Sequence, residues 1–406
     1  MAADRPARAY LDYNATAPLR PESRAAVVAA LDTVGNPSSV HAEGRAARQI
    51  VERARAEVGR LAGVPARCVT FLSGATEAAN AALNPRLGLT AAEAALDRLI
   101  VSAGEHPCVL QGHRFPAAAV EVAPLRPDGR IDLDGLREAC RRPGRALLAL
   151  QGANNETGVV QPVAEAAAIV RAAGGRVFCD AVQLAGKAPF SPASLGADVL
   201  AVSAHKLGGP KGVGALIAAS AGTGLGDPFL RGGGQERGAR AGTENVASIA
   251  GFGAAAAAAM PGMAEEALRL EALRRGLADA VRAACPDAVL FGEGAPRLPN
   301  TLCFAAPGLE ASTLMIALDL AGIAVSSGSA CASGKVAPSH VLAAMGVEPA
   351  LARAAIRLSL GWASTVVDVE RFADAFASAV RRIRAGRAPA PGPRRDADLA
   401  PAAGRV

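Results

Sequence analysis

The chain has 406 residues, of which 51% are hydrophobic, 20% charged and 3% aromatic, and its length predicts one large domain plus a smaller one. The net charge of +6 is not gathered into a basic block with interleaved aromatics, which excludes nucleic acid as a direct partner. No stretch reaches the ~18 apolar residues of a membrane span and the start has no apolar leader, so we expect a cytoplasmic protein with no membrane contact. The seven cysteines are scattered singly, so we expect neither a disulfide framework nor a zinc site.

The first expected element is an amphipathic helix, because apolar residues recur at helical spacing from Ile50 to Leu61. From about Val69 to Ala219, short β-branched or Leu-rich runs alternate with longer helical patterns, which indicates βαβ units and a mostly parallel sheet. The expected strands are Val69 to Leu72, Leu99 to Ala103, Ala146 to Leu150, Arg176 to Cys179, Asp198 to Ser203 and Val213 to Ala218. Ligands of such sheets bind at the carboxyl ends of the strands, where polar residues collect in this sequence.

A long helical tract follows, from about Glu244 to Ala284, broken by Pro261 and Gly262. Beyond it, the expected elements of an α+β unit are strands at Asn300 to Ala305 and Ala355 to Leu360 and helices near Ser312 to Ala321 and Val367 to Ile383. We therefore expect a large domain over residues 15–260 and a small domain formed by residues 1–14 and 261–385. The Pro/Ala/Arg-rich end, residues 386–406, is expected to be a disordered tail.

Lys206 follows the expected strand that ends at Ser203, where a lysine can bind the aldehyde of pyridoxal phosphate (PLP) as a Schiff base. Asp180 ends the neighbouring strand and would keep the pyridine nitrogen protonated, while Gln183 can reach the ring hydroxyl. Taken singly, Asp180 is more often a turn cap and Lys206 a solvated lysine. The combination of the three residues favours a cofactor site.

A phosphate site is expected at Gly74-Ala75-Thr76, which lies between a strand and a helix. The backbone N–H groups and the Thr76 hydroxyl can bind an anion at the positive end of the helix dipole, although ordinary helix capping explains the same residues. Ser203 and His205 are the other candidate phosphate ligands.

Three polar residues have two readings each. His106 follows the strand Leu99 to Ala103 and either stacks on the cofactor ring and transfers protons or is a lone surface histidine. Asn155 is either a turn residue or a ligand of the ring hydroxyl. Arg357 has apolar neighbours on an expected strand, so its guanidinium needs a carboxylate, either from an amino-acid substrate or from a structural ion pair.

Cys331 lies in the loop Ser326-Ser327-Gly328-Ser329-Ala330-Cys331, which is rich in glycine and serine. Such a loop is flexible and exposed, unlike the setting of an inert core cysteine. With an ordinary thiol pKa of ~8.5, Cys331 can supply a partly ionised nucleophile to a substrate and then carry the product away. The other cysteines, including Cys179, are expected in the core, with Cys108 notable for its closeness to His106.

In these residues the chain resembles the cysteine desulfurases, which are fold-type I, class V aminotransferase-like PLP enzymes, and specifically the group with this catalytic-cysteine loop. The resemblance covers the chain from Tyr10 to about Phe376. Its motifs are Tyr10-Leu11-Asp12-Tyr13, Gly35-Asn36-Pro37-Ser38-Ser39, Ser73-Gly74-Ala75-Thr76-Glu77, Glu105-His106, Asn154-Asn155-Glu156-Thr157-Gly158, Asp180-Ala181-Val182-Gln183, Ser203-Ala204-His205-Lys206, Gly209-Pro210-Lys211-Gly212, Gly232-Gly233-Gly234-Gln235-Glu236-Arg237, Arg240-Ala241-Gly242-Thr243-Glu244-Asn245, Cys331 and Arg357-Leu358-Ser359-Leu360-Gly361. The segment Asn14 to Pro18 and the pair Pro107-Cys108 depart from the family's usual residues.

The resemblance implies an α/β fold with a large domain, built on a mainly parallel seven-stranded sheet flanked by helices, and a smaller α+β domain. It implies that Lys206 binds PLP covalently, that Asp180 holds the pyridine nitrogen and that His106 stacks on the ring. Gln183 and Asn155 would contact the ring hydroxyl, Asn155 also lying near the substrate, and Arg357 would bind the substrate carboxylate. The phosphate ligands would be Ala75, Thr76, Ser203 and His205, joined by Thr243 from the other subunit of a homodimer.

The implied reaction is removal of sulfur from L-cysteine, which gives L-alanine and a persulfide on Cys331. The sulfur would pass to an acceptor such as an iron–sulfur scaffold or a sulfur-carrier protein, and Cys331 would be a candidate transient iron–sulfur ligand in a complex with the scaffold. A selenocysteine lyase or another class V aminotransferase or lyase is the alternative within the fold. A catalytically silent binding platform is the alternative outside catalysis, and the presence of Lys206 and Asp180 argues against it.

Overall fold

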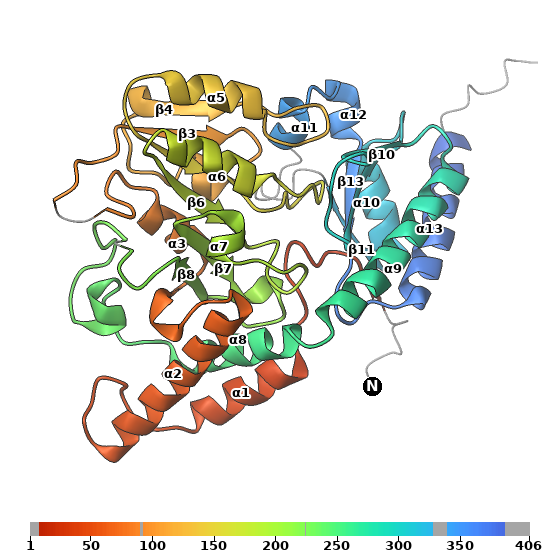
Figure 1. Ribbon diagram of the computed structural model, residues 1–406. Helices are drawn as coiled ribbons and strands as arrows, with labels where there is room; N and C mark the ends of the chain where they lie inside the picture. The colour runs from red at the N-terminus through yellow and green to blue at the C-terminus, as the bar shows by residue number, and fades with distance from the viewer. Residues whose placement is uncertain (1–7, 90–91, 224, 328–338, 386–406) are drawn as a thin grey trace, which may run out of the picture.

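The computed structural model describes residues 8–89, 92–223, 225–327 and 339–385, and its largest element is a seven-stranded sheet (Figure 1). The strand order is β2-β8-β7-β6-β5-β3-β4. The strands are β2 (Val69–Leu72), β3 (Arg98–Ser102), β4 (Val120–Ala123), β5 (Ala146–Ala149), β6 (Arg176–Asp180), β7 (Val199–Ser203) and β8 (Gly214–Ala218). Neighbours from β7 to β4 pair in parallel, and only β8 runs antiparallel to both its neighbours. The expected mainly parallel seven-stranded sheet is confirmed.

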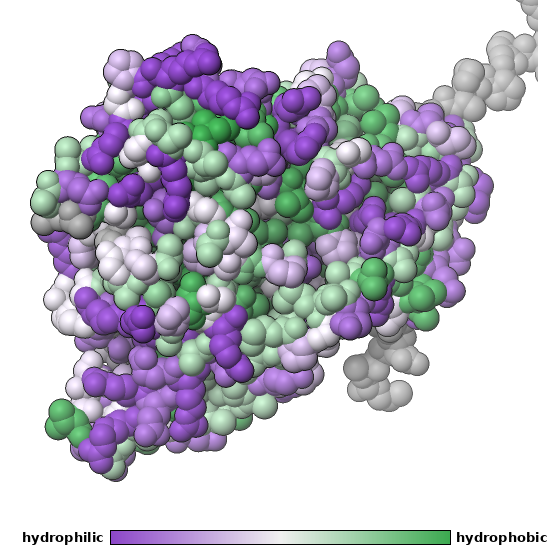
Figure 2. All heavy atoms as spheres, viewed as in Figure 1, coloured by the Kyte–Doolittle hydropathy of each residue, from purple (hydrophilic) through white to green (hydrophobic). Residues whose placement is uncertain are grey.

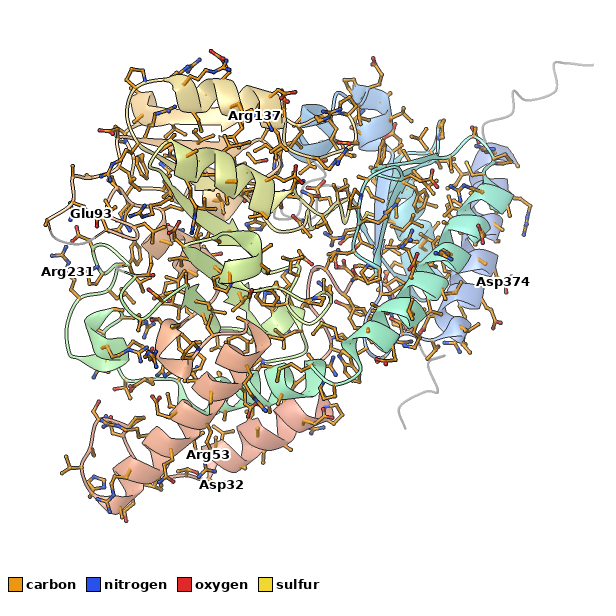
Figure 3. All side chains as sticks on the ribbon, in the orientation of Figure 1. Asp32, Arg53, Glu93, Arg137, Arg231 and Asp374 are labelled. Carbon is orange, nitrogen blue, oxygen red and sulfur yellow. The ribbon has the colours of Figure 1, made fainter. Side chains whose placement is uncertain are left out.

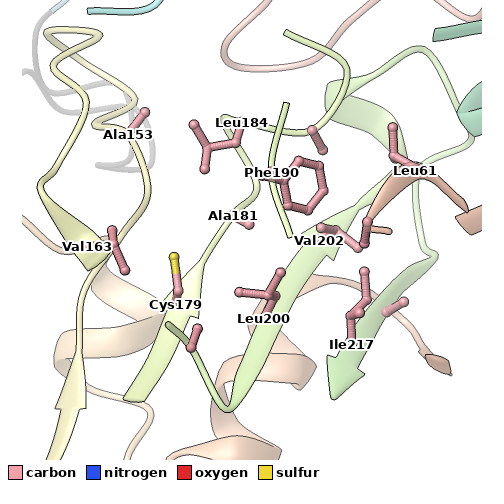
Figure 4. Packing of buried hydrophobic residues seen from close by; sticks show 14 of the residues in the cluster. Leu61, Ala153, Val163, Cys179, Ala181, Leu184, Phe190, Leu200, Val202 and Ile217 are labelled. Carbon is pink, nitrogen blue, oxygen red and sulfur yellow. The ribbon is translucent and has the colours of Figure 1, made fainter. Parts of the chain in front are cut away.

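Both faces of this sheet are buried except at the edge strand β4, which explains why its inner strands are mostly continuous apolar runs. Successive residues of β6 and β7 point to opposite faces, so Cys179 and Leu200 join one hydrophobic cluster, while Phe178 and Val199 join another. Figure 4 shows Cys179 and Leu200 side by side on adjacent strands, beneath Phe190. The helices of this part of the chain are α1 (Pro21–Leu31), α2 (Ala42–Leu61), α3 (Ala75–Ala82), α4 (Pro107–Leu110), α5 (Leu133–Arg141), α6 (Val163–Ala172), α7 (Pro192–Leu195) and α8 (Val246–Ala259), with short 3₁₀ turns at Ala66–Cys68, Ala117–Ala119, Ala204–Lys206 and Gln235–Gly238.

A second, antiparallel sheet with the order β12-β13-β10-β9 lies beside the first (Figure 1). Its strands are β9 (Val289–Leu290), β10 (Thr301–Ala305), β12 (Ser326–Ser327) and β13 (Ala355–Ser359), and β1 (Ala9–Tyr10) pairs in parallel with β11 (Ile323–Ala324) next to it. Its helices are α9 (Met263–Ala284), α10 (Ala311–Leu320), α11 (His340–Ala344), α12 (Pro349–Arg353) and α13 (Val366–Ala385). Its core includes Phe304, which meets Phe376 edge to face at a ring separation of 5.5 Å.

The expected helix break at Pro261 and Gly262 separates α8, which packs on α1 and α2, from α9, which packs on α13. The division into domains at residues 260 and 261 stays a prediction. Several elements were not predicted, among them strand β4 and helix α1. Strand β4 lies at the sheet edge with only Ala123 buried, and helix α1 buries only Ser23 and Ala30, so neither shows a periodic apolar pattern.

Charged side chains cover the outer helices. Figure 2 shows hydrophilic residues gathered over α5 and along α2, and Figure 3 shows Arg137 on α5, Arg53 on α2 and Asp374 on α13 at the periphery. Within the described ranges, no single helix is long and apolar enough to span a membrane; α8 and α9 pass that test only as a pair bent by 81°. The expected disordered tail, residues 386–406, lies outside the described residues.

Candidate active site

A pocket of about 540 Å³ opens where β5, β6 and β7 end and α3 begins. It is lined by ten of the residues singled out in the sequence, namely Ala75, Thr76, His106, Asn155, Asp180, Gln183, Ser203, His205, Lys206 and Arg357. Thr243 is exposed and lies outside this pocket, on the wall of a neighbouring cavity of about 230 Å³. Cys331 falls outside the described residues. The sheet topology therefore gathers nearly the whole predicted set at one place.

Lys206 and Asp180 face this pocket from neighbouring strand ends. Lys206 lies in the 3₁₀ turn that follows β7, and its Nζ donates to the carbonyl oxygens of Asn14 and Ala15 at 2.5 and 2.9 Å. Asp180 ends β6, and its Oδ1 accepts the Val182 N–H at 2.9 Å. Burial raises the pKa of Asp180, against the opposing effects of Val182 and Lys206. The charged form of such a buried carboxyl is stabilised by a cationic N–H donor, and a protonated pyridine is a donor of this kind.

Gln183 connects the pocket wall to two other residues. Its Nε2 donates to the carbonyl oxygen of Asn14 at 3.2 Å, the same oxygen that accepts from Lys206. Its Oε1 accepts from the Nζ of Lys187 at 2.7 Å. Neither Asn14 nor Lys187 was predicted as a site residue.

The start of α3 forms an anion cradle at the pocket edge. Its N-cap, Gly74, offers no side-chain hydrogen bond, so the first N–H groups of the helix keep their capacity to bind an anion. Strand β8 approaches this turn so closely that a Cβ on Gly214 would lie 2.8 Å from the Cα of Gly74. Next to it, Glu77 accepts the Ser73 N–H at 2.7 Å and pairs with Arg240 at 3.2 Å, which neutralises the carboxylate nearest the cradle.

Both histidines of the pocket are neutral near pH 7. Burial, with the charges of Lys206 and His340, lowers the pKa of His106 to about 4, and burial with Lys206, Lys211 and Lys187 does the same for His205. The Nδ1 of His106 accepts the Cys108 N–H at 3.2 Å, so the ring proton resides on Nε2. His106 is thus a neutral ring that can stack on a cofactor and exchange a proton through Nε2.

Arg357 combines the two readings that the sequence left open. It is 1% exposed on β13, and its Nη2 donates to Oδ1 of Asp12 at 2.7 Å while its Nη1 donates to the Asn155 carbonyl at 3.2 Å. Its Nε has no hydrogen-bond partner within the described part of the chain. The guanidinium is therefore held by a structural ion pair and still lines the pocket with donors to spare.

Two buried carboxyls next to the site were also missed. The Oε1 of Glu105 accepts the Gln151 N–H at 2.6 Å, its Oε2 has no partner among the residues described, and burial together with Asp180 raises its pKa. Glu156 accepts the Ser339 hydroxyl, and burial raises its pKa to about 7. Both belong to motifs that were singled out, but nothing in the sequence distinguishes a buried carboxyl from a surface one. No group of three or more metal-ligating side chains occurs in the described ranges.

Comparisons with known proteins agree with this geometry. Residues 9–372 match the family model "Aminotransferase class-V". The chain is 43% identical over 392 residues to a cysteine desulfurase of Frankia sp. (strain EuIK1), covering 92% of each chain, and 38% identical over 383 residues to an IscS-like cysteine desulfurase of Mycobacterium tuberculosis, covering 93% of this chain and 97% of that protein.

Among solved structures, the chain is similar to a NifS-like protein from Rickettsia africae, with a TM-score of 0.83 and 32% identity over 92% of this chain and 99% of that one. It is also similar to SspA in complex with cysteine, with a TM-score of 0.72 and 27% identity over 86% of this chain and 98% of that one. With a family match across most of its length and relatives well above 30% identity, the chain belongs to the aminotransferase class-V family.

Proposed function

We propose that this chain is a PLP-dependent cysteine desulfurase, which removes sulfur from L-cysteine and leaves L-alanine and an enzyme persulfide. The observation that carries the proposal is the convergence of Lys206, Asp180 and Arg357 on one pocket. A lysine and an acid on adjacent strand ends suit PLP, and a buried arginine suits a carboxylate substrate. The relatives named as cysteine desulfurases select this activity among those of the family.

The residues present fit PLP, which when bound supplies an electron sink for the substrate's bonds. Lys206 would hold the cofactor aldehyde, Asp180 the pyridine nitrogen and the start of α3, with Thr76, Ser203 and His205, the phosphate. The position of the Asp180 carboxyl on the pocket wall and the uncapped N-terminus of α3 support this placement. His106 would lie against the ring as a neutral imidazole, and Gln183 and Asn155 would contact the ring hydroxyl.

For the substrate, Arg357 would bind the carboxylate of L-cysteine with the donors that its ion pair leaves over. The solved structure of the similar protein SspA holds cysteine, which supports this choice of substrate. The Cys331 thiolate would attack the substrate sulfur, so that an S–S bond forms as the C–S bond breaks. The electron pair of the C–S bond passes to carbon, which takes up a proton and becomes the methyl group of alanine.

The proposal includes a homodimer that completes two sites. Thr243 is exposed and does not line this chain's own pocket, which supports its assignment to the phosphate site of the other subunit. The persulfide would then be transferred to an acceptor such as an iron–sulfur scaffold or a sulfur-carrier protein.

The test is to incubate purified protein and PLP with L-cysteine and to measure alanine and persulfide or sulfide, for wild type, Lys206→Ala and Cys331→Ala. Wild type should give both products. Lys206→Ala should lose the visible cofactor band and all activity, and Cys331→Ala should keep the band but lose the persulfide. Equal sulfur release by Cys331→Ala and wild type would reject the persulfide step, and would favour a lyase with no thiol nucleophile.

A further inference from the structure

Lys187 is a buried lysine next to the pocket that the proposed reaction does not use. It follows β6 in the turn 182–187 and is 8% exposed. Gly186 has a φ of 72° and lies close to the segment that follows β7. A Cβ on Gly186 would lie 3.1 Å from the Cβ of Leu207. The turn is therefore closely packed, and the low exposure of Lys187 and its bond to Gln183 show that its side chain is buried.

The surroundings of Lys187 disfavour its charge. No carboxylate lies within ion-pair distance of its Nζ in the part of the chain that the structure describes. Burial, with the like charges of Lys206 and Arg357, lowers its pKa to about 7. An uncompensated buried ammonium costs several kcal/mol. Burying an apolar side chain of similar length at this position would cost less free energy, which indicates that the lysine has another role.

What Lys187 contributes is an orientation for the amide of Gln183. A lysine amine in this position donates hydrogen bonds, and its Nζ lies 2.7 Å from Oε1 of Gln183. The amide oxygen must therefore face Lys187, and the NH₂ group must face the Asn14 carbonyl, 3.2 Å away, and the pocket. Lys187 and the Asn14 carbonyl thus act on opposite ends of the amide, and without Lys187 its orientation would depend on the Asn14 carbonyl alone.

We propose that Lys187 is a positioning residue that fixes the Gln183 amide so that it presents an N–H donor, and not its carbonyl oxygen, to the ring oxygen of PLP. This inference rests on the proposed function, because it requires PLP in the pocket. The second N–H of Gln183 is the one left over after the bond to Asn14. The Asn14 carbonyl also accepts from Lys206, so one backbone oxygen sets the positions of the donor and of the cofactor-binding lysine.

The test is the pKa at which the visible absorption of the bound cofactor changes. An N–H donor to the ring oxygen stabilises its anionic form and keeps this pKa low. A hydrogen bond to a charged group contributes about 1.5–3 kcal/mol, equivalent to about 1–2 pKa units. Lys187→Met should therefore raise the cofactor pKa by about 1–2 units and weaken PLP binding by at least about tenfold.

The decisive comparison repeats Lys187→Met in a Gln183→Ala background. If Lys187 acts through Gln183, its removal should shift the cofactor pKa no further in that background. An equal shift in both backgrounds, or no shift in the Lys187→Met protein, would overturn the proposal. Arg53→Met, an exposed arginine on α2, is the matched control for loss of a cation and should leave the pKa unchanged.

If Lys187→Met does not fold, Lys187→Gln can replace it in the comparison of the two backgrounds, since the new amide can still donate a hydrogen bond to Gln183. It should shift the cofactor pKa by less than Lys187→Met, and a larger shift would count against the proposal. A wild-type protein that shows no PLP-dependent band at all would instead refute the proposed function, an outcome that this readout separates from failure of the inference.

Discussion

Replacing Arg357 with methionine should weaken binding of L-cysteine specifically through its carboxylate. A guanidinium has five N–H donors, and in this structure one is used by Asp12 and one by the Asn155 carbonyl. Arg357 lines the pocket, and its Nη protons beyond those two bonds are the donors that we expect a ligand carboxylate to use. Two hydrogen bonds to a carboxylate, at about 1.5–3 kcal/mol each, give a loss of at least about 3 kcal/mol, which is more than about 100-fold in affinity.

The assay is the dissociation constant of L-cysteine, read from the change in the cofactor's visible spectrum, compared with that of cysteamine, which lacks the carboxylate. Arg357→Met should weaken cysteine binding by more than about 100-fold and cysteamine binding by less than about fivefold. Asp12→Asn, which keeps the arginine but removes its ionic partner, is the control and should change the cysteine constant by less than about tenfold. Equal losses for the two amines in Arg357→Met would refute the assignment and leave Arg357 a purely structural ion pair.

Three further predictions follow from the buried groups. Burial raises the pKa of Glu156 to about 7 from an ordinary 4.5, so the stability linked to its protonated form is present below pH 4.5 and is lost as the pH rises to about 7. Because glutamine cannot ionise, the melting temperature of Glu156→Gln should rise relative to that of wild type over this pH range. A difference in melting temperature that does not change with pH would contradict this. Because burial lowers the pKa of His106 to about 4, His106→Asn should reduce kcat/KM without removing an inflection near pH 6.5; loss of such an inflection would show a normal histidine. Phe304→Ala, at a site with no exposed surface, should cost about 3–5 kcal/mol by its urea midpoint, whereas Leu268→Ala, 69% exposed, should cost less than about 0.5 kcal/mol.

Much of the fold was readable from the sequence because the central strands are buried on both faces. Strand β7, predicted from Asp198 to Ser203, is observed at Val199–Ser203, and α13, predicted from Val367 to Ile383, is observed at Val366–Ala385. Elements that bury little gave no periodic signal, as for β4, whose Glu121 is at the sheet edge. Periodic apolar patterns in the sequence reveal which face of an element is buried. Elements with few buried side chains, which are held mainly by pairing with neighbouring elements, are therefore missed.

The site was predictable for a different reason, namely that parallel strands deliver their ends to one edge. Asp180 and Lys206 are far apart in sequence but follow neighbouring strands, and the topology brings both to the pocket. Lys187 and Asp12 were missed as partners because their roles depend on what lies across from them after folding. Nothing in the local sequence shows that Lys187 is buried against Gln183 or that Asp12 meets Arg357.

Asn14 explains how the second sheet controls the geometry of the pocket. Its backbone N–H donates to Oγ of Ser359 on β13 at 2.9 Å, and its Nδ2 donates to Oγ1 of Thr301 on β10 at 2.8 Å. Its carbonyl oxygen accepts from both Lys206 and Gln183, which lie in turns that follow strands of the large sheet. A buried polar network of this kind is stable only when all its members are satisfied, so a displacement of the second sheet would disturb the lysine and the glutamine together. The position of Lys206, the proposed cofactor-binding lysine, is therefore set by both sheets, although Lys206 itself follows a strand of only one.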